Sequence, residues 1–154
     1  IDLEGFDALA EKQALFALAH HWAMKTSTLL SMADDTGAIA TCLVATPAAL
    51  VAMKLHALQD RRAGRPEKIG SDSRDLYVLL EHFDRDGSIG GAIAAAPGPL
   101  PALVANATQR ELVDGAVRLE RSMLVYSQAT PQPPFADDLI FVGQRLIASL
   151  DEEA

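Results

Sequence analysis

The chain has 154 residues, of which 49% are hydrophobic and 22% are charged. This length suits one globular domain or most of one, and the hydrophobic content excludes general disorder. Acidic residues outnumber basic residues by 21 to 13, giving a formal net charge of −8, so the surface as a whole is not a polyanion-binding scaffold. No apolar run approaches the roughly 18 residues that a membrane span needs. The composition therefore predicts a soluble protein.

Cysteine content and the chain start predict the compartment and the context of the chain. Cys42 is the single cysteine, so an internal disulfide and a paired zinc motif are both excluded. This is typical of a cytoplasmic protein. The chain begins at Ile1 and shows no signal-peptide pattern. We expect Ile1–Glu4 to be a strand that belongs to a longer protein.

The first third of the sequence predicts a helix, a hairpin and a second helix. Residues 6–22 carry apolar side chains at helical spacing without Pro or Gly, which predicts a helix. Two β-prone runs then flank Asp34-Asp35-Thr36-Gly37, which predicts a β-hairpin. Thr46 and Pro47 supply an N-cap and a first helical residue. That helix should run to about Arg62 and end at the Gly- and Pro-containing stretch that follows.

The remainder of the chain is predicted to be helical. A helix should start at Gly70-Ser71-Asp72 and continue to about Phe83. Breaks are expected at 97–99 and 130–134, where prolines gather. Apolar stripes along 111–126 and along the last helix predict core-facing sides. The expected fold class is therefore α+β, a strand stub and a β-hairpin followed by a mostly helical bundle.

Basic residues concentrate in one part of the sequence. Positions 51–75 hold six basic and four acidic residues, so this window has a net charge of +2 (6 − 4), whereas the rest of the chain has −10 (−8 − 2). A nucleic acid or a phosphate would therefore bind at a local patch rather than over the whole surface. The six basic residues of the window are Lys54, Arg61, Arg62, Arg65, Lys68 and Arg74.

Lys54 stands in an apolar helical stripe. Its neighbours three and four residues away on a helix are Leu50, Val51, Ala57 and Leu58, so its side chain leaves from the side that faces the core. Such a lysine either extends its ammonium group to water or meets a partner inside the fold.

Asp72 and Asp75 show a matching pattern in the next predicted helix, whose apolar side is Leu76, Leu79, Leu80 and Phe83. Both carboxylates are expected in the first turn, where they either cap the helix or meet an inward-facing cation. Inward charges on two consecutive helices suit phosphate chemistry. Cations compensate a triphosphate, and a carboxylate orients the lysine or accepts a proton from a hydroxyl. The sequence has no Walker loop and no Asp-x-Asp on a strand.

Two further features are interpreted as structural. His20 and His21 are neighbours that point about 100° apart on a helix, which favours packing over metal ligation. The stretch 84–89 is similar to the middle of a calcium loop, but His82 and Ile93 would occupy its first and last ligand positions, where oxygen ligands are required.

The segment 44–58, followed by Arg61, Lys68 and the sequence Ser71-Asp72-Ser73-Arg74-Asp75-Leu76-Tyr77, resembles the AbiEii/MenT nucleotidyltransferase toxins. The segment 19–24 before the hairpin fits as well, and the resemblance covers about positions 1–85. The family is similar to DNA polymerase β-type nucleotidyltransferases, and mycobacterial relatives add nucleotides to tRNA 3′ ends. The resemblance implies that 1–45 is the end of the α/β catalytic core and that 46–154 is a helical C-terminal domain. The family's Gly-Ser motif and its following Asp-x-Asp would lie upstream of Ile1.

The resemblance also implies roles for individual residues. Lys54 would be the active-site lysine that holds NTP phosphates, and Asp72 or Asp75 would be the later catalytic acid, with the spacing leaving both open. Asp2 would be a third carboxylate, at the metal. The implied cofactors and partners are Mg²⁺, NTP, tRNA and a cognate antitoxin protein. The tRNA backbone would bind Arg61, Arg62, Arg65 and Lys68.

The alternative is a non-catalytic helical interaction module that binds an antitoxin or another protein. The missing metal motif and the acidic helical tail favour it. The enzyme hypothesis requires Lys54 and Asp72 or Asp75 to converge on one open cleft beside the hairpin, with Arg61 at its rim.

Overall fold

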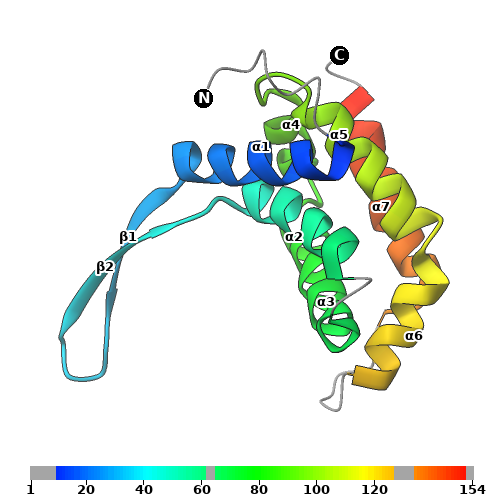
Figure 1. Cartoon of the computed structure of the whole chain (residues 1–154). Helices are drawn as coiled ribbons and strands as arrows, with labels where there is room; N and C mark the ends of the chain where they lie inside the picture. The colour runs from blue at the N-terminus through cyan, green and yellow to red at the C-terminus, as the bar shows by residue number, and fades with distance from the viewer. Residues whose placement is uncertain (1–9, 62–64, 127–133, 152–154) are drawn as a thin grey trace.

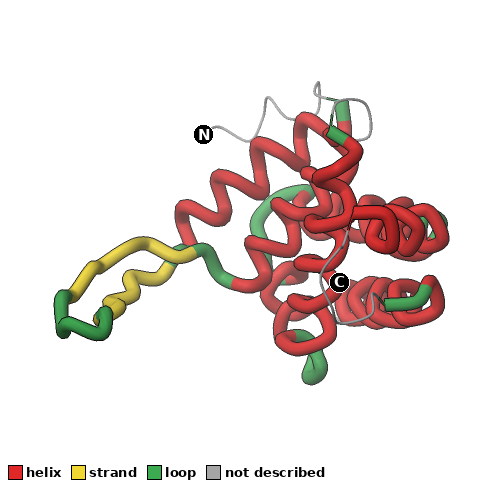
Figure 2. The backbone as a smooth tube through the Cα atoms, turned by 90° about the horizontal axis from the view of Figure 1, so that it is seen from below, coloured by secondary structure: helices red, strands yellow, loops and turns green. Residues whose placement is uncertain are grey.

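The computed structural model describes residues 10–61, 65–126 and 134–151, and these form a helical body with one projecting β-hairpin (Figure 1). In Figure 2, turned by 90°, the hairpin again stands clear of the helices. The described part is therefore α+β, as the sequence predicts. The elements are α1 (Glu11–Thr26), β1 (Thr28–Ala33), β2 (Ile39–Val44), α2 (Pro47–Arg61), α3 (Pro66–Phe83), α4 (Ser88–Ala94), α5 (Leu100–Thr108), a π-helical turn η2 (Gln109–Val113), α6 (Ala116–Tyr126) and α7 (Ala136–Asp151).

The hairpin forms where the sequence predicts it. β1 and β2 pair antiparallel from Thr28↔Val44 to Ala33↔Ile39. The turn is held by Asp34, whose Oδ1 accepts hydrogen bonds from the amides of Thr36 at 2.9 Å and Ala38 at 3.0 Å. Gly37 has φ +81°, a backbone conformation that glycine adopts at low cost.

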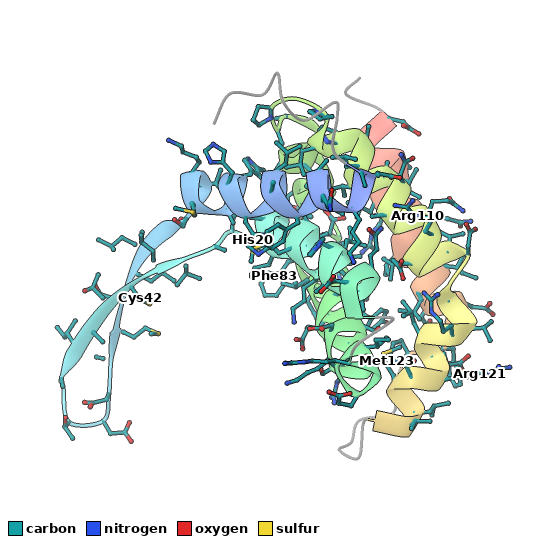
Figure 3. The ribbon with its side chains drawn as sticks, viewed as in Figure 1. His20, Cys42, Phe83, Arg110, Arg121 and Met123 are labelled. Carbon is teal, nitrogen blue, oxygen red and sulfur yellow. The ribbon has the colours of Figure 1, made fainter. Side chains whose placement is uncertain are left out.

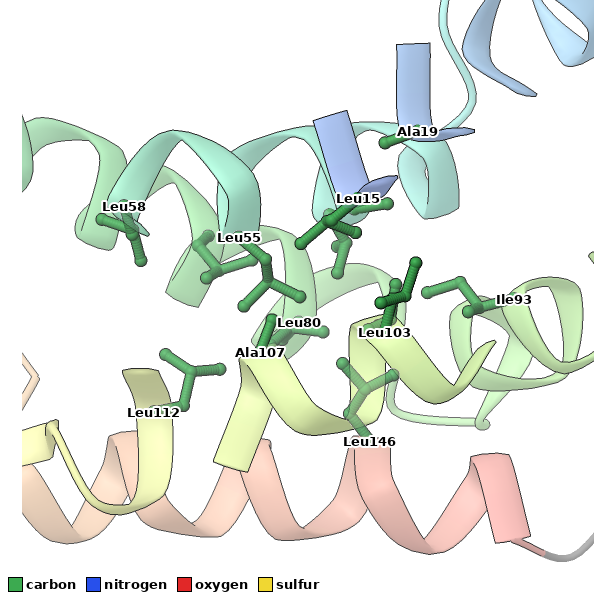
Figure 4. Close-up of a cluster of buried hydrophobic side chains, with 14 of the residues drawn as sticks. Leu15, Ala19, Leu55, Leu58, Leu80, Ile93, Leu103, Ala107, Leu112 and Leu146 are labelled. Carbon is green, nitrogen blue, oxygen red and sulfur yellow. The ribbon is translucent and has the colours of Figure 1, made fainter. Parts of the chain in front are cut away.

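One hydrophobic core holds the helices together. Leu15 of α1, Leu55 of α2, Leu80 of α3 and Leu146 of α7 are all almost completely buried, and Figure 4 shows these side chains converging from their separate helices. The apolar stripes expected in the C-terminal part are confirmed as core-facing. Their buried members are Leu112, Ala116, Leu119, Met123, Leu139, Val142, Leu146 and Leu150.

The start of α2 confirms the predicted cap. The Ala49 amide donates to Thr46 Oγ1 at 3.3 Å, and Pro47 is the first helical residue. A threonine oxygen therefore satisfies one of the amides that a helix start leaves without a partner.

The predicted start of the following helix is wrong. α3 begins at Pro66, four residues before Gly70, because proline has the φ angle of a first helical residue and Glu67 suits the positive end of the helix dipole. Asp72 and Asp75 consequently lie in the second and third turns. The interpretation of Asp72 as a first-turn cap is therefore incorrect.

Other boundaries shift by a few residues. α1 continues past Trp22 to Thr26, whose hydroxyl donates to the Trp22 carbonyl at 2.9 Å. The helix predicted over 111–126 is interrupted before α6 at Gly115, where a Cβ would lie 2.6 Å from the Glu111 carbonyl oxygen. The break at 97–99 is confirmed between α4 and α5.

The N-terminal predictions are only partly covered by the structure. The strand stub Ile1–Glu4, including Asp2, lies outside the described residues. α1 packs against α2 in the common core, and the division of the chain at 45/46 stays a prediction. Within the described ranges, no helix combines the length and the apolar character of a bilayer-crossing segment.

Candidate functional site

Lys54 on α2 meets both acidic residues that the sequence singles out on α3. Its Nζ donates to Asp72 Oδ1 at 2.8 Å and to Asp75 Oδ2 at 2.6 Å. The contact exists because α2 and α3 pack side by side and because 72 and 75, three residues apart, share one side of a helix. The expected inward-facing charges therefore meet one another.

The three side chains differ in their exposure. The Asp72 side chain is 6% exposed and that of Lys54 is 26% exposed, whereas the Asp75 side chain is 57% exposed. The buried Asp72 carboxylate needs a cationic partner at this position, and Lys54 supplies one. Formal charges of one cation and two anions leave the cluster at −1. Asp72 is therefore the buried part of the cluster, and Asp75 is the part that solutes can reach.

An open cleft of about 320 Å³ lies beside this cluster, between α1, α2 and α3. Lys54 and Asp72 form one part of its lining, and Asp60, which pairs with Lys12 at 2.7 Å, forms another. Its described lining includes no hairpin residue. The cleft has room for a small polar ligand next to the lysine.

Three aromatic rings form one wall of the cleft. The Phe16 ring centroid lies 4.2 Å from that of His20 and 4.9 Å from that of His56, and His20 is seen on α1 in Figure 3. His20 Nδ1 lies 2.8 Å from the Phe16 carbonyl oxygen. The expected packing role of His20 is therefore confirmed. Burial lowers the pKa of His56 below 6.5, although the Asp60 carboxylate partly opposes this shift.

His56 is the site residue that the sequence interpretation missed. It stands two positions after Lys54. It also stands four positions before Asp60, so His56 and Asp60 share one side of α2. That spacing was the available signal. The approach of His56 to Phe16 depends on how α1 crosses α2, which no local pattern encodes.

Of the basic-window side chains that the structure describes, the cleft lining includes Lys54. Arg65 and Lys68 are exposed around the start of α3, and neither lines the cleft. Arg62 and the side chain of Arg61 lie outside the described residues, as does Asp2. Of the predicted site residues, the structure brings together Lys54, Asp72 and Asp75.

The described residues do not make a Mg²⁺ site. They contain no group of three or more acidic, histidine or cysteine side chains with metal-binding geometry, and Asp72 and Asp75 both bind Lys54. Mg²⁺ prefers octahedral oxygen coordination, so it would require carboxylates from elsewhere.

The calcium-like stretch has a structural use. Asp84 is buried, and its Oδ1 accepts hydrogen bonds from the amides of Ile89 at 2.8 Å and Gly90 at 3.1 Å at the start of α4. Burial raises the pKa of Asp84, while these two hydrogen bonds act in the opposite direction. Asp84 thus satisfies helix amides, as an N-terminal capping group does.

A second pocket, of about 480 Å³, lies at the base of the hairpin. Trp22 and Phe83 give it an aromatic lining, and Thr26 and Thr46, next to the two strands, form part of its wall. Phe83 is labelled in Figure 3. This pocket is more apolar than the cleft at Lys54, with no charged side chain in its described lining.

No protein-family model matches the chain, and no curated protein and no solved structure matches it either. The cluster at Lys54 and the cleft beside it are therefore the features that bear on its function.

Proposed function

We propose that this chain is the C-terminal portion of a nucleotidyltransferase toxin of the AbiEii/MenT type, which transfers nucleotides from NTP to RNA, at the 3′ end of tRNA. The observation that carries the proposal is the contact of Lys54 with both Asp72 and Asp75, with Lys54 and Asp72 in the lining of an open cleft. Sequence spacing alone singled out these three residues, and the fold joins them.

The cluster has the chemistry for handling phosphate. An ammonium group has three N–H donors, and the two carboxylates accept from two of them. The third can donate to a phosphate oxygen on which charge develops during transfer. Because its position is fixed before substrate arrives, the lysine needs little reorganisation in the reaction.

The two carboxylates suit different tasks. Buried Asp72 holds Lys54 in place. Asp75, more than half exposed, would accept the proton of the RNA 3′-hydroxyl as its oxygen bonds to the α-phosphorus of the NTP and pyrophosphate leaves. Phe16 and His20 form a wall on which a base can stack. In this proposal Asp75 contacts the substrate and Asp72 is a positioning residue.

The proposal includes the partners that the family resemblance implies. The exposed Arg65 and Lys68, with Arg61 and Arg62, would contact tRNA phosphates, and a cognate antitoxin protein would bind in the cytoplasm. Mg²⁺ would be held by carboxylates outside the described residues, including Asp2.

The decisive experiment replaces Lys54. In the protein that carries this chain together with its upstream catalytic part, Lys54→Ala should reduce NTP transfer to tRNA by at least about 100-fold, the scale for losing one preorganised donor. Arg121→Ala is the matched control, since it removes an exposed basic side chain of α6 that lies outside the cleft, and it should retain full transfer. Equal transfer by the two variants would show that the site assignment is wrong.

One observation favours the second candidate, an interaction module that binds an antitoxin or another protein. Large apolar side chains on the hairpin, Leu29, Ile39 and Leu43 among them, are exposed. Titration of the chain with labelled NTP separates the two candidates. Binding that Lys54→Ala weakens supports the enzyme, whereas no binding at millimolar NTP favours the module.

A further inference from the structure

The hairpin is apolar on both of its faces. In the observed register Leu30 and Met32 share one face with Val44, and Leu29 shares the other with Leu43 and Ile39. Leu29, Ile39 and Leu43 are 65%, 73% and 69% exposed, and no helix of the described chain packs over the strands. Apolar residues on both faces are typical of strands inside a larger sheet. An isolated two-stranded hairpin is marginally stable in water.

Among the described residues, no strand pairs with the outer edge of β1 either. All six of its residues are exposed, and the strand has no charge, no proline and no bulge, the features with which proteins protect an edge. The Asp34 amide donates to the Ala38 carbonyl oxygen across the hairpin. Because inward and outward main-chain groups alternate, those of Leu29, Ser31 and Ala33 point away from β2. They are placed to bind another strand.

We propose that β1 pairs antiparallel with β1 of a second copy of this chain, so that two hairpins form one four-stranded sheet. Two identical edges pair in this way about a two-fold axis perpendicular to the sheet, which gives a closed, self-complementary dimer. In one register that satisfies the outward N–H and C=O groups, Leu30 lies opposite Leu30 of the second copy. Leu29 of each copy then lies opposite Ser31 of the other, and both of these residues have outward-pointing main-chain groups.

Charge complementarity points to an identical copy as the partner. The hairpin has Asp34 and Asp35 at its tip, and the exposed Lys25 stands in the last turn of α1 at its base. Antiparallel pairing brings the tip of each hairpin to the base of the other. Each acidic tip then lies beside a lysine, and the pairing joins two chains of net charge −8 through strands without charge.

The shape of the molecule permits the pairing. The hairpin projects away from the helical body in both views (Figures 1 and 2), and a six-residue strand spans about 20 Å. The second body therefore lies beyond the tip of the first hairpin. The tip of each hairpin also comes next to the apolar pocket of the other copy, where Trp22 and Phe83 lie.

A matched pair of variants at Ser31 tests the strand pairing. Ser31→Pro removes an outward N–H, and Ser31→Ala keeps it, while both remove the hydrogen bond between Ser31 Oγ and Thr41 Oγ1. Proline is tolerated on an edge strand where its N–H would face outward. Light scattering and sedimentation from about 1 to 500 μM should show dimers for the wild type and Ser31→Ala. The dissociation constant of Ser31→Pro should be at least about tenfold higher, from two lost hydrogen bonds per dimer, with an unchanged helical circular dichroism spectrum.

A charge exchange tests the identity of the partner. Lys25→Glu alone, or Asp35→Lys alone, should weaken the dimer, and the combined variant should restore it, with Asp34 kept because its carboxylate holds the turn. A wild-type monomer over the whole range overturns the proposal, because the hairpin would then require a different strand. Equal dimerisation of Ser31→Pro and Ser31→Ala also overturns it, because the interface would then lie on another surface.

Discussion

At the scale of single residues, Lys54 makes one buried contact, with Asp72, and one exposed contact, with Asp75. Asp72 is buried and Asp75 is largely exposed, although both bind the same ammonium group at similar distances. The free energy of an ion pair depends strongly on burial, since solvent screens an exposed pair and an unsatisfied buried group is costly. The two bonds should therefore differ in their contribution to stability.

Replacing each carboxylate by its amide measures this difference. Asp72→Asn should lower the free energy of unfolding by about 1–3 kcal/mol, because it takes the negative charge from a buried bond to Lys54. Asp75→Asn should lower it by at most about 1 kcal/mol, as for an exposed pair. Urea denaturation at neutral pH gives both values. A larger loss for Asp75→Asn would contradict the assignment of Asp72 as the residue that positions Lys54.

His56 makes stability depend on pH. Its folded-state pKa lies below 6.5 because burial disfavours the charged ring. As the pH falls through 6.5, the unfolded chain binds a proton before the folded chain does, so the free energy of unfolding decreases in the window below 6.5. His56→Gln should remove that part of the decrease, which urea denaturation at a series of pH values measures.

NMR titration of the ring provides an independent check on His56. Asp60→Asn should lower the His56 pKa further, since it removes the main charge that raises it. A wild-type His56 pKa at or above 6.5 would contradict the burial of this ring in the cleft wall.

At the scale of elements, the sequence predicts best what is decided locally. Thr46 and Pro47 specify a helix start by themselves, and Asp34 to Gly37 specify the hairpin turn. Pro66 fits both the end of one helix and the first turn of the next, so the sequence interpretation misplaced the start of α3. The contact of Lys54 with Asp72 could be predicted from the sequence because helical spacing places both residues on the core-facing sides of their helices.

Features that depend on the angle and position at which two helices cross could not be predicted from the sequence. The meeting of Phe16 with His56 requires the observed placement of α1 over α2. The open cleft also results from this crossing. Helix packing angles follow from the fit of whole side-chain surfaces, and a short motif contains little of that information.

Packing of α4 on α7 gives a prediction at this scale. A Cβ on Gly90 would lie 2.3 Å from the Ser149 Cβ, so Gly90→Ala should reduce stability by about 1–3 kcal/mol through overpacking. Adding Ser149→Gly removes the clashing atom. The double variant should be no less stable than Gly90→Ala alone, even though a glycine inside a helix costs about 1 kcal/mol. Simple additivity of the two losses in thermal unfolding would refute a direct clash.

At the scale of the whole molecule, α1 links the hairpin to the helical body. Its Leu15 is buried in the same core as Leu55 and Leu80. The resemblance, however, divides the chain at 45/46 and assigns α1 to the catalytic part. The core contacts predict that α1 unfolds together with the C-terminal helices as one cooperative unit.

Trp22, the single tryptophan of the chain, lies in α1, so its fluorescence reports on α1 while circular dichroism reports on all helices. Leu15→Ala should lower the free energy of unfolding by about 2–5 kcal/mol and shift both signals to the same lower urea midpoint. Leu29→Ala removes an exposed hairpin side chain. It should shift neither urea midpoint when the protein concentration is below the dissociation constant of the proposed dimer. If the fluorescence transition precedes the circular dichroism transition, α1 unfolds separately, and the boundary at 45/46 marks a real division of the chain.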